Sequence, residues 1–170
     1  MKKIITKAAA LLLALAVLGG CTNINQNGNS GLQSNPDFSV YCFSAGKADA
    51  FLLYTESSAV LIDCGEKGFG KEILGKLEEL GIEKLDYLII THFDKDHVGG
   101  AARVINNISI DNVIVSNCPK DSEEYEKYEK ALENAGLSAN VLSNSLAFTL
   151  DGVSYTIYPP AKSDYKSNGS

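Results

Sequence analysis

The chain has 170 residues, a formal net charge of −6 at pH 7 and a hydrophobic fraction of 45%. Residues 1–20 contain three lysines and no acidic residue, so the remainder is more acidic than the chain as a whole. Such an acidic domain does not bind nucleic acid or anionic lipid through broad charge attraction, which excludes a general nucleic-acid or membrane-surface binding protein.

Residues 1–20 have the pattern of an export signal and are not expected to be part of the fold. A positive region with three lysines precedes an apolar stretch at residues 8–18. This stretch is too short to span a bilayer, which needs about 20 apolar residues. Residues 18–21 read Leu-Gly-Gly-Cys and resemble the lipobox of bacterial lipoproteins. Cys21 would then carry the lipid (palmitate) as the first residue of the mature protein, and the alternative is an ordinary signal peptide cut near Gly20.

Residues 23–36 are rich in Asn, Gln, Gly and Ser and have little apolar surface to bury. We therefore expect residues 21–36 to be a flexible, lipidated tether, which would hold the domain at the extracytoplasmic face of the cell membrane. Residues 37–170 remain for the folded part, enough for one domain with a hydrophobic core.

The folded part opens with three short apolar stretches at residues 38–43, 50–54 and 59–62. Strands this close in sequence predict an antiparallel or mixed edge of a sheet. After a loop at residues 65–70, apolar residues recur at helical spacing from Ile73 to Leu80, until Gly81. This stripe predicts a helix that packs on the core.

An apolar strand predicted at residues 85–91 leads into a loop rich in histidine and aspartate. Residues 91–100 read Thr-His-Phe-Asp-Lys-Asp-His-Val-Gly-Gly and contain the only two histidines of the chain, His92 and His97. Imidazole and carboxylate are ligands that suit Zn²⁺, Mn²⁺ or iron, so the loop predicts a metal site formed by these histidines with Asp94 and Asp96. The alternative is that Asp96 only caps a helix and the histidines are incidental.

The glycines that follow, Gly99 and Gly100, support the metal interpretation, because glycine is unfavourable in a first helical turn unless the backbone comes close to something. A metal with its substrate is such a neighbour. A short helix is expected at residues 98–105.

The rest of the chain alternates between strand and helix patterns. We expect a strand at residues 113–115, a charged helix at 122–135 with Tyr125, Tyr128 and Leu132 on one face, and closing strands at 139–142, 146–150 and 153–158. Asp151-Gly152 between the last two strands is a strong hairpin signal. Strands interleaved with amphipathic helices predict an α/β layered domain.

Apart from Cys21, the cysteines are Cys42, Cys64 and Cys118. At most one disulfide can form among three thiols. Cys42 and Cys118 are expected to be buried strand residues that act as small hydrophobes. Cys64 follows a strand end, where a thiolate ligand is the less favoured alternative to burial.

Three motifs in order resemble the metallo-β-lactamase superfamily, most closely its competence-protein branch, over about residues 38–160. Residues 92–97 read His-Phe-Asp-Lys-Asp-His and match the H-x-H-x-D-H motif, with Asp94 in place of the second histidine. In this substitution the chain resembles the competence-protein branch. Residues 46–50 resemble the G-x-G-D-[AS] turn with Ala48 where a glycine is expected, and residues 61–65 match L-I-D-x-G.

The resemblance implies an αββα sandwich, of which the chain would hold the N-terminal half. It implies that His92 and Asp94 serve one divalent metal and that Asp96 and His97 serve a second. Asp96 would be the catalytic base, while Asp63 and Asp49 would support the metal loop. One or two ions of Zn²⁺ or Mn²⁺ are expected, and the donor set does not distinguish these two metals.

The family continues beyond Tyr158 to a Gly-Asp pair and later ligands, whereas this sequence ends at Ser170. Either the chain is a fragment, which is the favoured alternative, or a second chain completes the fold, or catalysis has been lost. A half sandwich is expected to leave one face of its sheet uncovered.

The leading hypothesis is a membrane-tethered metal-dependent hydrolase with a phosphodiester or nucleic-acid substrate, and Lys47, Lys95 and Lys120 would give local positive charge at the site. The rival is a non-catalytic lipoprotein that binds a metal or a partner.

Overall fold

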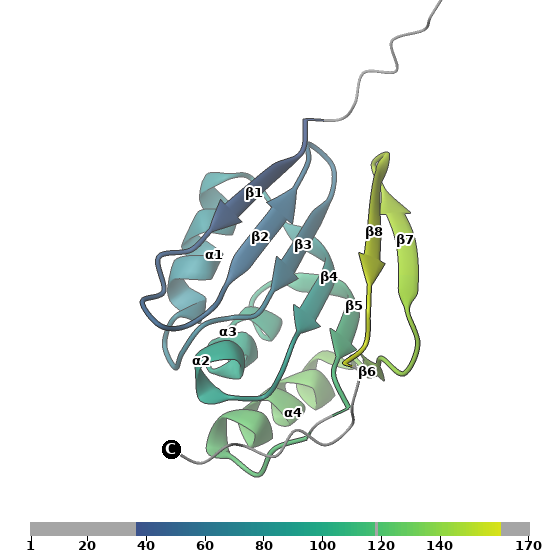
Figure 1. The fold of residues 1–170 in the computed structure, drawn as a ribbon. Helices are drawn as coiled ribbons and strands as arrows, with labels where there is room; N and C mark the ends of the chain where they lie inside the picture. Colours follow the sequence, from purple (N-terminus) through teal and green to yellow (C-terminus); the bar gives the residue numbers. More distant parts are fainter. Residues whose placement is uncertain (1–36, 118, 161–170) are drawn as a thin grey trace, which may run out of the picture. The chain divides into compact units, whose positions relative to one another are not determined.

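The computed structural model describes residues 37–117 and 119–160. A mixed six-stranded sheet forms the centre, with its strands in sequence order from β1 to β6 (Figure 1). Strand β2 is antiparallel to both of its neighbours, β1 and β3, and β3 to β6 run parallel. The strands are β1 (Ser39–Cys42), β2 (Phe51–Tyr54), β3 (Ala59–Ile62), β4 (Lys84–Ile90), β5 (Ser109–Val115) and β6 (Ala139–Val141). The predicted antiparallel edge of a mixed sheet is confirmed.

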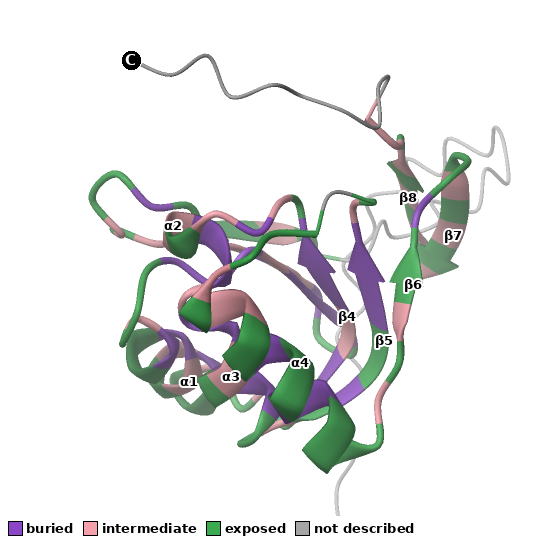
Figure 2. Ribbon diagram, turned by 90° about the horizontal axis from the view of Figure 1, so that it is seen from below, coloured by how far each residue is buried: buried purple, intermediate pink, exposed green. Residues whose placement is uncertain are grey.

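Helices cover one face of this sheet. They are α1 (Gly70–Glu79), α2 (Lys95–Val98), α3 (Ala101–Ile105) and α4 (Glu123–Ala135). Ile73 and Leu77 of α1 and Tyr128 of α4 join the main hydrophobic cluster, together with sheet residues such as Leu88. Figure 2 shows the buried residues gathered between the helices and the sheet, and the exposed residues on the outer sides of the helices. The stripe from Ile73 to Leu80 and the apolar face of α4 therefore pack as predicted.

A hairpin of β7 (Leu146–Leu150) and β8 (Val153–Ile157) lies on the opposite face of the sheet (Figure 1). Its turn is Asp151-Gly152, and both residues have positive φ, as a tight two-residue hairpin requires. Phe148 stacks on Tyr87 of β4 with ring centroids 4.0 Å apart. The expectation that one face of the sheet is uncovered is thus wrong for its centre, because the hairpin encloses a second cluster there.

Two sequence predictions differ from the structure in their extent. The helix expected at residues 98–105 is shorter and is α3, while the expected loop before it contains a further short helix, α2, and Gly99 and Gly100 separate the two. Strand β5 begins at Ser109 rather than at residue 113. The prediction was too short because the exposed polar residues Asp111 and Asn112 interrupt the apolar pattern of the strand. The α/β layered fold class is confirmed.

The predicted export signal at residues 1–20 and the predicted tether at 21–36, with Cys21, lie outside the described residues. Within residues 37–117 and 119–160, none of the helices combines the length and the apolar character that a membrane crossing requires.

Candidate functional site

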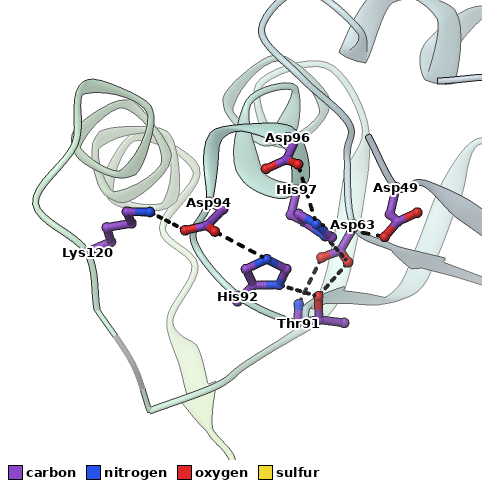
Figure 3. Close-up of polar contacts among 8 residues, drawn as sticks. All are labelled: Asp49, Asp63, Thr91, His92, Asp94, Asp96, His97 and Lys120. Atoms are coloured by element: carbon purple, nitrogen blue, oxygen red, sulfur yellow. Dashed lines mark hydrogen bonds and ion pairs between the residues drawn. The ribbon is translucent and has the colours of Figure 1, made fainter. Parts of the chain in front are cut away.

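The sequence-predicted site residues come together at one edge of the sheet. Parallel strands β3 and β4 end at the same edge, and Asp63 and Thr91 are the residues that directly follow them. Strand β2 begins there because it is antiparallel to β3, which brings Asp49 to the same edge. Figure 3 shows these residues with His92, Asp94, Asp96 and His97 of the following loop and helix.

Backbone hydrogen bonds tie the three loops at this edge to one another. The N–H of Cys64 donates to the carbonyl of His97 at 2.7 Å, and the N–H of Asp49 donates to the carbonyl of Asp96 at 3.2 Å. The N–H of Gly65 donates to the carbonyl of Asp49 at 2.9 Å. The positions of Asp49, Asp96 and His97 are therefore coupled through main-chain contacts and do not depend on side chains alone.

Gly99 and Gly100 allow these loops to approach each other. A Cβ atom at Gly100 would lie 2.2 Å from the carbonyl oxygen of Cys64, and one at Gly99 would lie 2.4 Å from the backbone nitrogen of Lys67. The expectation that the two glycines make room for a metal and its substrate is therefore wrong. Their close neighbours are backbone atoms of the segment after β3, which only glycine accommodates.

Asp63 lies at the centre of a buried polar network. Its φ of +56° is in the left-handed region, which non-glycine residues adopt rarely and mostly at sites where the surroundings fix them. Oδ1 accepts from the backbone N–H of Thr91 at 2.8 Å, and Oδ2 accepts from the Thr91 hydroxyl at 2.6 Å. Oδ2 also lies 2.9 Å from Nδ1 of His97. This one carboxylate therefore contacts both the residue that follows β4 and a residue of α2.

These contacts determine which ring nitrogen of each histidine carries the proton. Nδ1 of His97 donates to the Asp63 carboxylate, which is only an acceptor. The hydroxyl hydrogen of Thr91 is already donated to Asp63, so Nδ1 of His92, 3.1 Å from that oxygen, acts as the donor there. A neutral imidazole whose Nδ1 donates in this way has an unprotonated Nε2, the form in which imidazole binds a metal.

Three carboxylates lie near these two nitrogens. Nε2 of His97 lies 3.8 Å from Oδ2 of Asp49 and 4.0 Å from Oδ2 of Asp96. Nε2 of His92 lies 3.7 Å from Oδ2 of Asp94, and the two imidazole centroids are 3.7 Å apart. The donor types, two imidazole nitrogens and three carboxylates, fit a divalent metal.

The spacing of the donors is wider than around a bound ion. Ligands of one tetrahedral zinc ion are about 3.4 Å from one another, given metal–ligand bonds of about 2.0–2.1 Å. Among residues 37–117 and 119–160, no group of three or more His, Cys, Asp or Glu side chains is close enough to hold an ion. The residues thus supply suitable donors at one edge without gathering them around one point.

Lys120, in the loop before α4, forms an ion pair with Asp94 (Figure 3). Both side chains are about half exposed. The hydrogen bond from the Lys120 ammonium lowers the pKa of Asp94 below its usual value. The Lys120–Asp94 pair is one contact that sequence reasoning missed, since only local positive charge was expected of Lys120. The role of Thr91 was missed too, and its position directly before His92 in the sequence was the signal that could have indicated it.

The alternative that Asp96 is a helix cap is wrong. Helix α2 begins at Lys95, its N-cap residue is Asp94, and the Asp94 side chain makes no capping hydrogen bond. Asp96 instead lies in the first turn of α2.

Cys64, the cysteine considered as an alternative ligand, is not a metal ligand at this edge. Cys64 is fully buried in the main hydrophobic cluster, and burial raises the pKa of its thiol, so it stays protonated. Cys42 is exposed, which contradicts its expected burial, because β1 is the edge strand of the sheet. Both thiols are free. Cys118 lies outside the described residues.

The comparison with protein families gives a match over most of the described chain. The sequence model of the metallo-beta-lactamase superfamily matches residues 44–158. No curated protein matches the chain. Among solved structures, the chain is similar to a metallo-beta-lactamase from Pontibacter korlensis, with 19% identity and a TM-score of 0.46 over 71% of this chain and 54% of that chain.

It is also similar to a quorum-quenching N-acyl homoserine lactone lactonase, with 20% identity and a TM-score of 0.39 over 64% of this chain and 55% of that chain. The chain thus spans about half the length of these two structures. The family match includes all three loops at the candidate site.

Proposed function

Because the chain belongs to the metallo-beta-lactamase superfamily, we propose that it is a metal-dependent hydrolase whose site is the edge formed by Asp49, Asp63 and residues 91–97. The observation that carries this proposal is the contact of His97 with Asp63. A carboxylate that holds Nδ1, so that Nε2 is the nitrogen left for a metal, is the arrangement that orients metal-binding histidines in proteins.

His92 and Asp94 would hold one divalent ion, and Asp96 and His97 would hold a second, with Zn²⁺ or Mn²⁺ as the candidates. When bound, such ions activate water and stabilise the charge that develops on an ester under attack. Asp63 orients His97, and Thr91 orients His92. Asp96, whose side chain is 42% exposed, is proposed as the base that accepts the proton of the attacking water.

An anionic ester, a phosphodiester or a nucleic-acid strand, is the proposed substrate. Lys120 supports this, since its ammonium lies at the site beside Asp94 and is half exposed. A cation at the mouth of the site would attract a negatively charged ester despite the acidic surface elsewhere.

We further propose that Cys21 anchors the protein to membrane lipid on the extracytoplasmic face. The support is the sequence Leu-Gly-Gly-Cys at residues 18–21 after an apolar stretch. Cys21→Ser should move the full chain from the membrane fraction to the soluble fraction. Retention of that variant in the membrane fraction would contradict lipidation at this residue.

A non-catalytic lipoprotein that binds a metal or a partner is the second candidate function. It is favoured by the pairing of Asp94 with Lys120, which occupies a carboxylate that the first function needs. If a second chain contributed further ligands, the metal site would be complete, and the first candidate function would no longer depend on Asp94 alone.

Hydrolysis of bis-p-nitrophenyl phosphate and of a β-lactam by the full chain, with Zn²⁺ or Mn²⁺ added, separates the two functions. Metal-dependent phosphodiester hydrolysis that is lost in His97→Ala supports the hydrolase. Asp111→Asn is a matched control, because Asp111 pairs with Lys84 near the opposite end of the sheet. Metal binding without hydrolysis of either compound would favour the second candidate.

A further inference from the structure

Strand β1 forms one edge of the six-stranded sheet. Among the described residues it pairs with β2 only, and Figure 1 shows it at the outer side of the sheet. The backbone groups along such an edge are unpaired, so the edge is a template for a further strand. Proteins commonly protect an edge with charged residues or proline. Strand β1 reads Ser-Val-Tyr-Cys and has neither form of protection.

The surface at this edge is apolar. Five large hydrophobic side chains are exposed among the described residues, and three of them lie in or directly before β1. These three are Phe38, Val40 and Tyr41, which are 44%, 54% and 37% exposed. Residues 38–46 contain no charged residue, whereas 21% of the whole chain is charged. An exposed apolar stretch of this kind indicates a surface that another molecule covers.

The hydrogen bonds between β1 and β2 determine which residues of β1 face outward. The N–H of Phe43 donates to the carbonyl of Ala50 at 3.1 Å. Bonded and non-bonded residues alternate along an antiparallel pair, so the backbone of Tyr41 also bonds to β2. Val40 and Cys42 therefore direct their N–H and C=O groups away from β2. The free edge offers two donors and two acceptors at these two residues.

The charge distribution favours a second copy of this chain as the molecule that covers the edge. Two copies with a net charge of −6 each repel one another in general, but contact along residues 38–46 brings no like charges together. The Lys76 ammonium lies 4.6 Å from the centroid of the Tyr41 ring, and it is already paired with Glu79. The edge is thus a part of this acidic protein where two copies meet without a charge penalty.

The stretches directly outside the described residues fit the edge less well. Residues 23–36 are rich in Asn, Gln, Gly and Ser, which are poor strand formers apart from Ser and Gln, and they end in Pro36. Residues 161–170 contain one large aromatic or aliphatic residue, Tyr165. Neither stretch has the alternating apolar pattern that a strand beside β1 would need.

We propose that β1 pairs antiparallel with β1 of a second copy, so that the two sheets join across a two-fold axis. Only one register pairs both outward-facing residues within the strand. In it, Val40 of each copy lies opposite Cys42 of the other copy, and the two Tyr41 residues lie opposite each other at the axis. This interface does not depend on the metal or on the proposed hydrolysis.

The association of the full chain without added metal is measured by analytical ultracentrifugation. Concentrations up to about 1 mM are used, because a short strand predicts a small interface and weak association. We expect wild type to form dimers and Val40→Lys to weaken dimerisation about tenfold or more, since a lysine on an edge strand opposes pairing. Val141→Lys is the matched control, because Val141 is 52% exposed on β6, the other edge strand. It should dimerise like wild type.

Val40→Pro separates the loss of pairing from the loss of folding. Proline removes the N–H of residue 40, which points away from β2, so the hydrogen bonds between β1 and β2 are retained. We expect this variant to be monomeric, with the circular dichroism spectrum of wild type.

The register is tested by oxidation of cysteine variants in a Cys42→Ser background, which is itself the baseline. In Tyr41→Cys, the new cysteines of the two copies face each other with Cα atoms about 4.5–5.5 Å apart, a distance that a disulfide spans. In Ser39→Cys they are four positions apart along the strands, about 13 Å, which is too far. We expect a disulfide-linked dimer only from Tyr41→Cys.

A monomer at every concentration of wild type would overturn the proposal. Dimerisation of Val40→Lys equal to that of wild type, or an equal loss in Val141→Lys, would overturn it as well. A disulfide that forms as readily in Ser39→Cys as in Tyr41→Cys, or in neither, would contradict the antiparallel pairing of β1 with β1.

Discussion

The two histidines of the candidate site are held in different ways. His97 is 11% exposed at its side chain, and its ring contacts the buried carboxylate of Asp63. His92 is 43% exposed, and its ring contacts Thr91 and the half-exposed Asp94. Buried, charge-assisted contacts fix a side chain more firmly than exposed ones, so the His97 side of the site is preorganised and the His92 side is adjustable.

The largest effect is expected from Asp63→Ala. This change leaves the Thr91 N–H, the Thr91 hydroxyl and Nδ1 of His97 without their buried acceptor. We expect the free energy of unfolding to fall by about 3 kcal/mol, as measured by urea denaturation. Asp94→Ala on the exposed side should cost less than about 1 kcal/mol. Similar losses in the two variants would contradict the distinction between the two sides.

Gly100→Ala should have the next largest effect. The added Cβ would meet the Cys64 carbonyl oxygen at 2.2 Å, so the loops around His97 would have to separate. We expect a loss of about 1–3 kcal/mol in the free energy of unfolding.

Gly75→Ala is the matched control for that glycine. Gly75 lies inside α1, and a Cβ atom there meets nothing within 4 Å. It should stabilise the protein by about 0.5–1 kcal/mol, because alanine favours helix over glycine. If Gly100→Ala were as harmless as Gly75→Ala, the close approach of the loops would not be a structural requirement.

Lys120→Met should have the smallest effect. Lys120 lowers the pKa of Asp94, so the pair stabilises the folded state when Asp94 is ionised and loses this contribution as the pH falls through the pKa of Asp94 in the folded state. Both side chains are half exposed, which limits the contribution to less than about 1 kcal/mol.

In metal-free protein, wild type and Lys120→Met should therefore differ slightly in melting temperature at pH 7 and should coincide at a pH well below the usual aspartate pKa. A difference that grows on acidification would contradict the assigned direction.

Local patterns were enough to predict most of the fold. Apolar periodicity identified α1 and α4, and Asp151-Gly152 identified the hairpin of β7 and β8, because each depends on residues near in sequence. The exposure of Cys42 was missed, since it depends on β1 being the edge strand.

The candidate site was predicted in its composition and less well in its contacts. The motif at residues 92–97 brought attention to both histidines and their neighbouring carboxylates, and the structure does place them at one edge with Asp49 and Asp63. Two contacts join segments that are distant in sequence, and no local pattern predicts them. They are the close approach of Gly100 to Cys64 and the ion pair of Lys120 with Asp94.

The central claim is that Asp63 preorganises the His97 side of the site. The metal affinity of the full chain tests this claim most directly. Asp63→Asn retains a residue that tolerates positive φ, and Lys120→Met alters only the exposed side. By titration with Zn²⁺ and Mn²⁺, we expect Asp63→Asn to weaken binding by about 10- to 100-fold, as loss of a carboxylate behind a ligating histidine does. We expect Lys120→Met to leave binding unchanged or tighter. Unchanged affinity in Asp63→Asn, or an equal loss in Lys120→Met, would contradict the account.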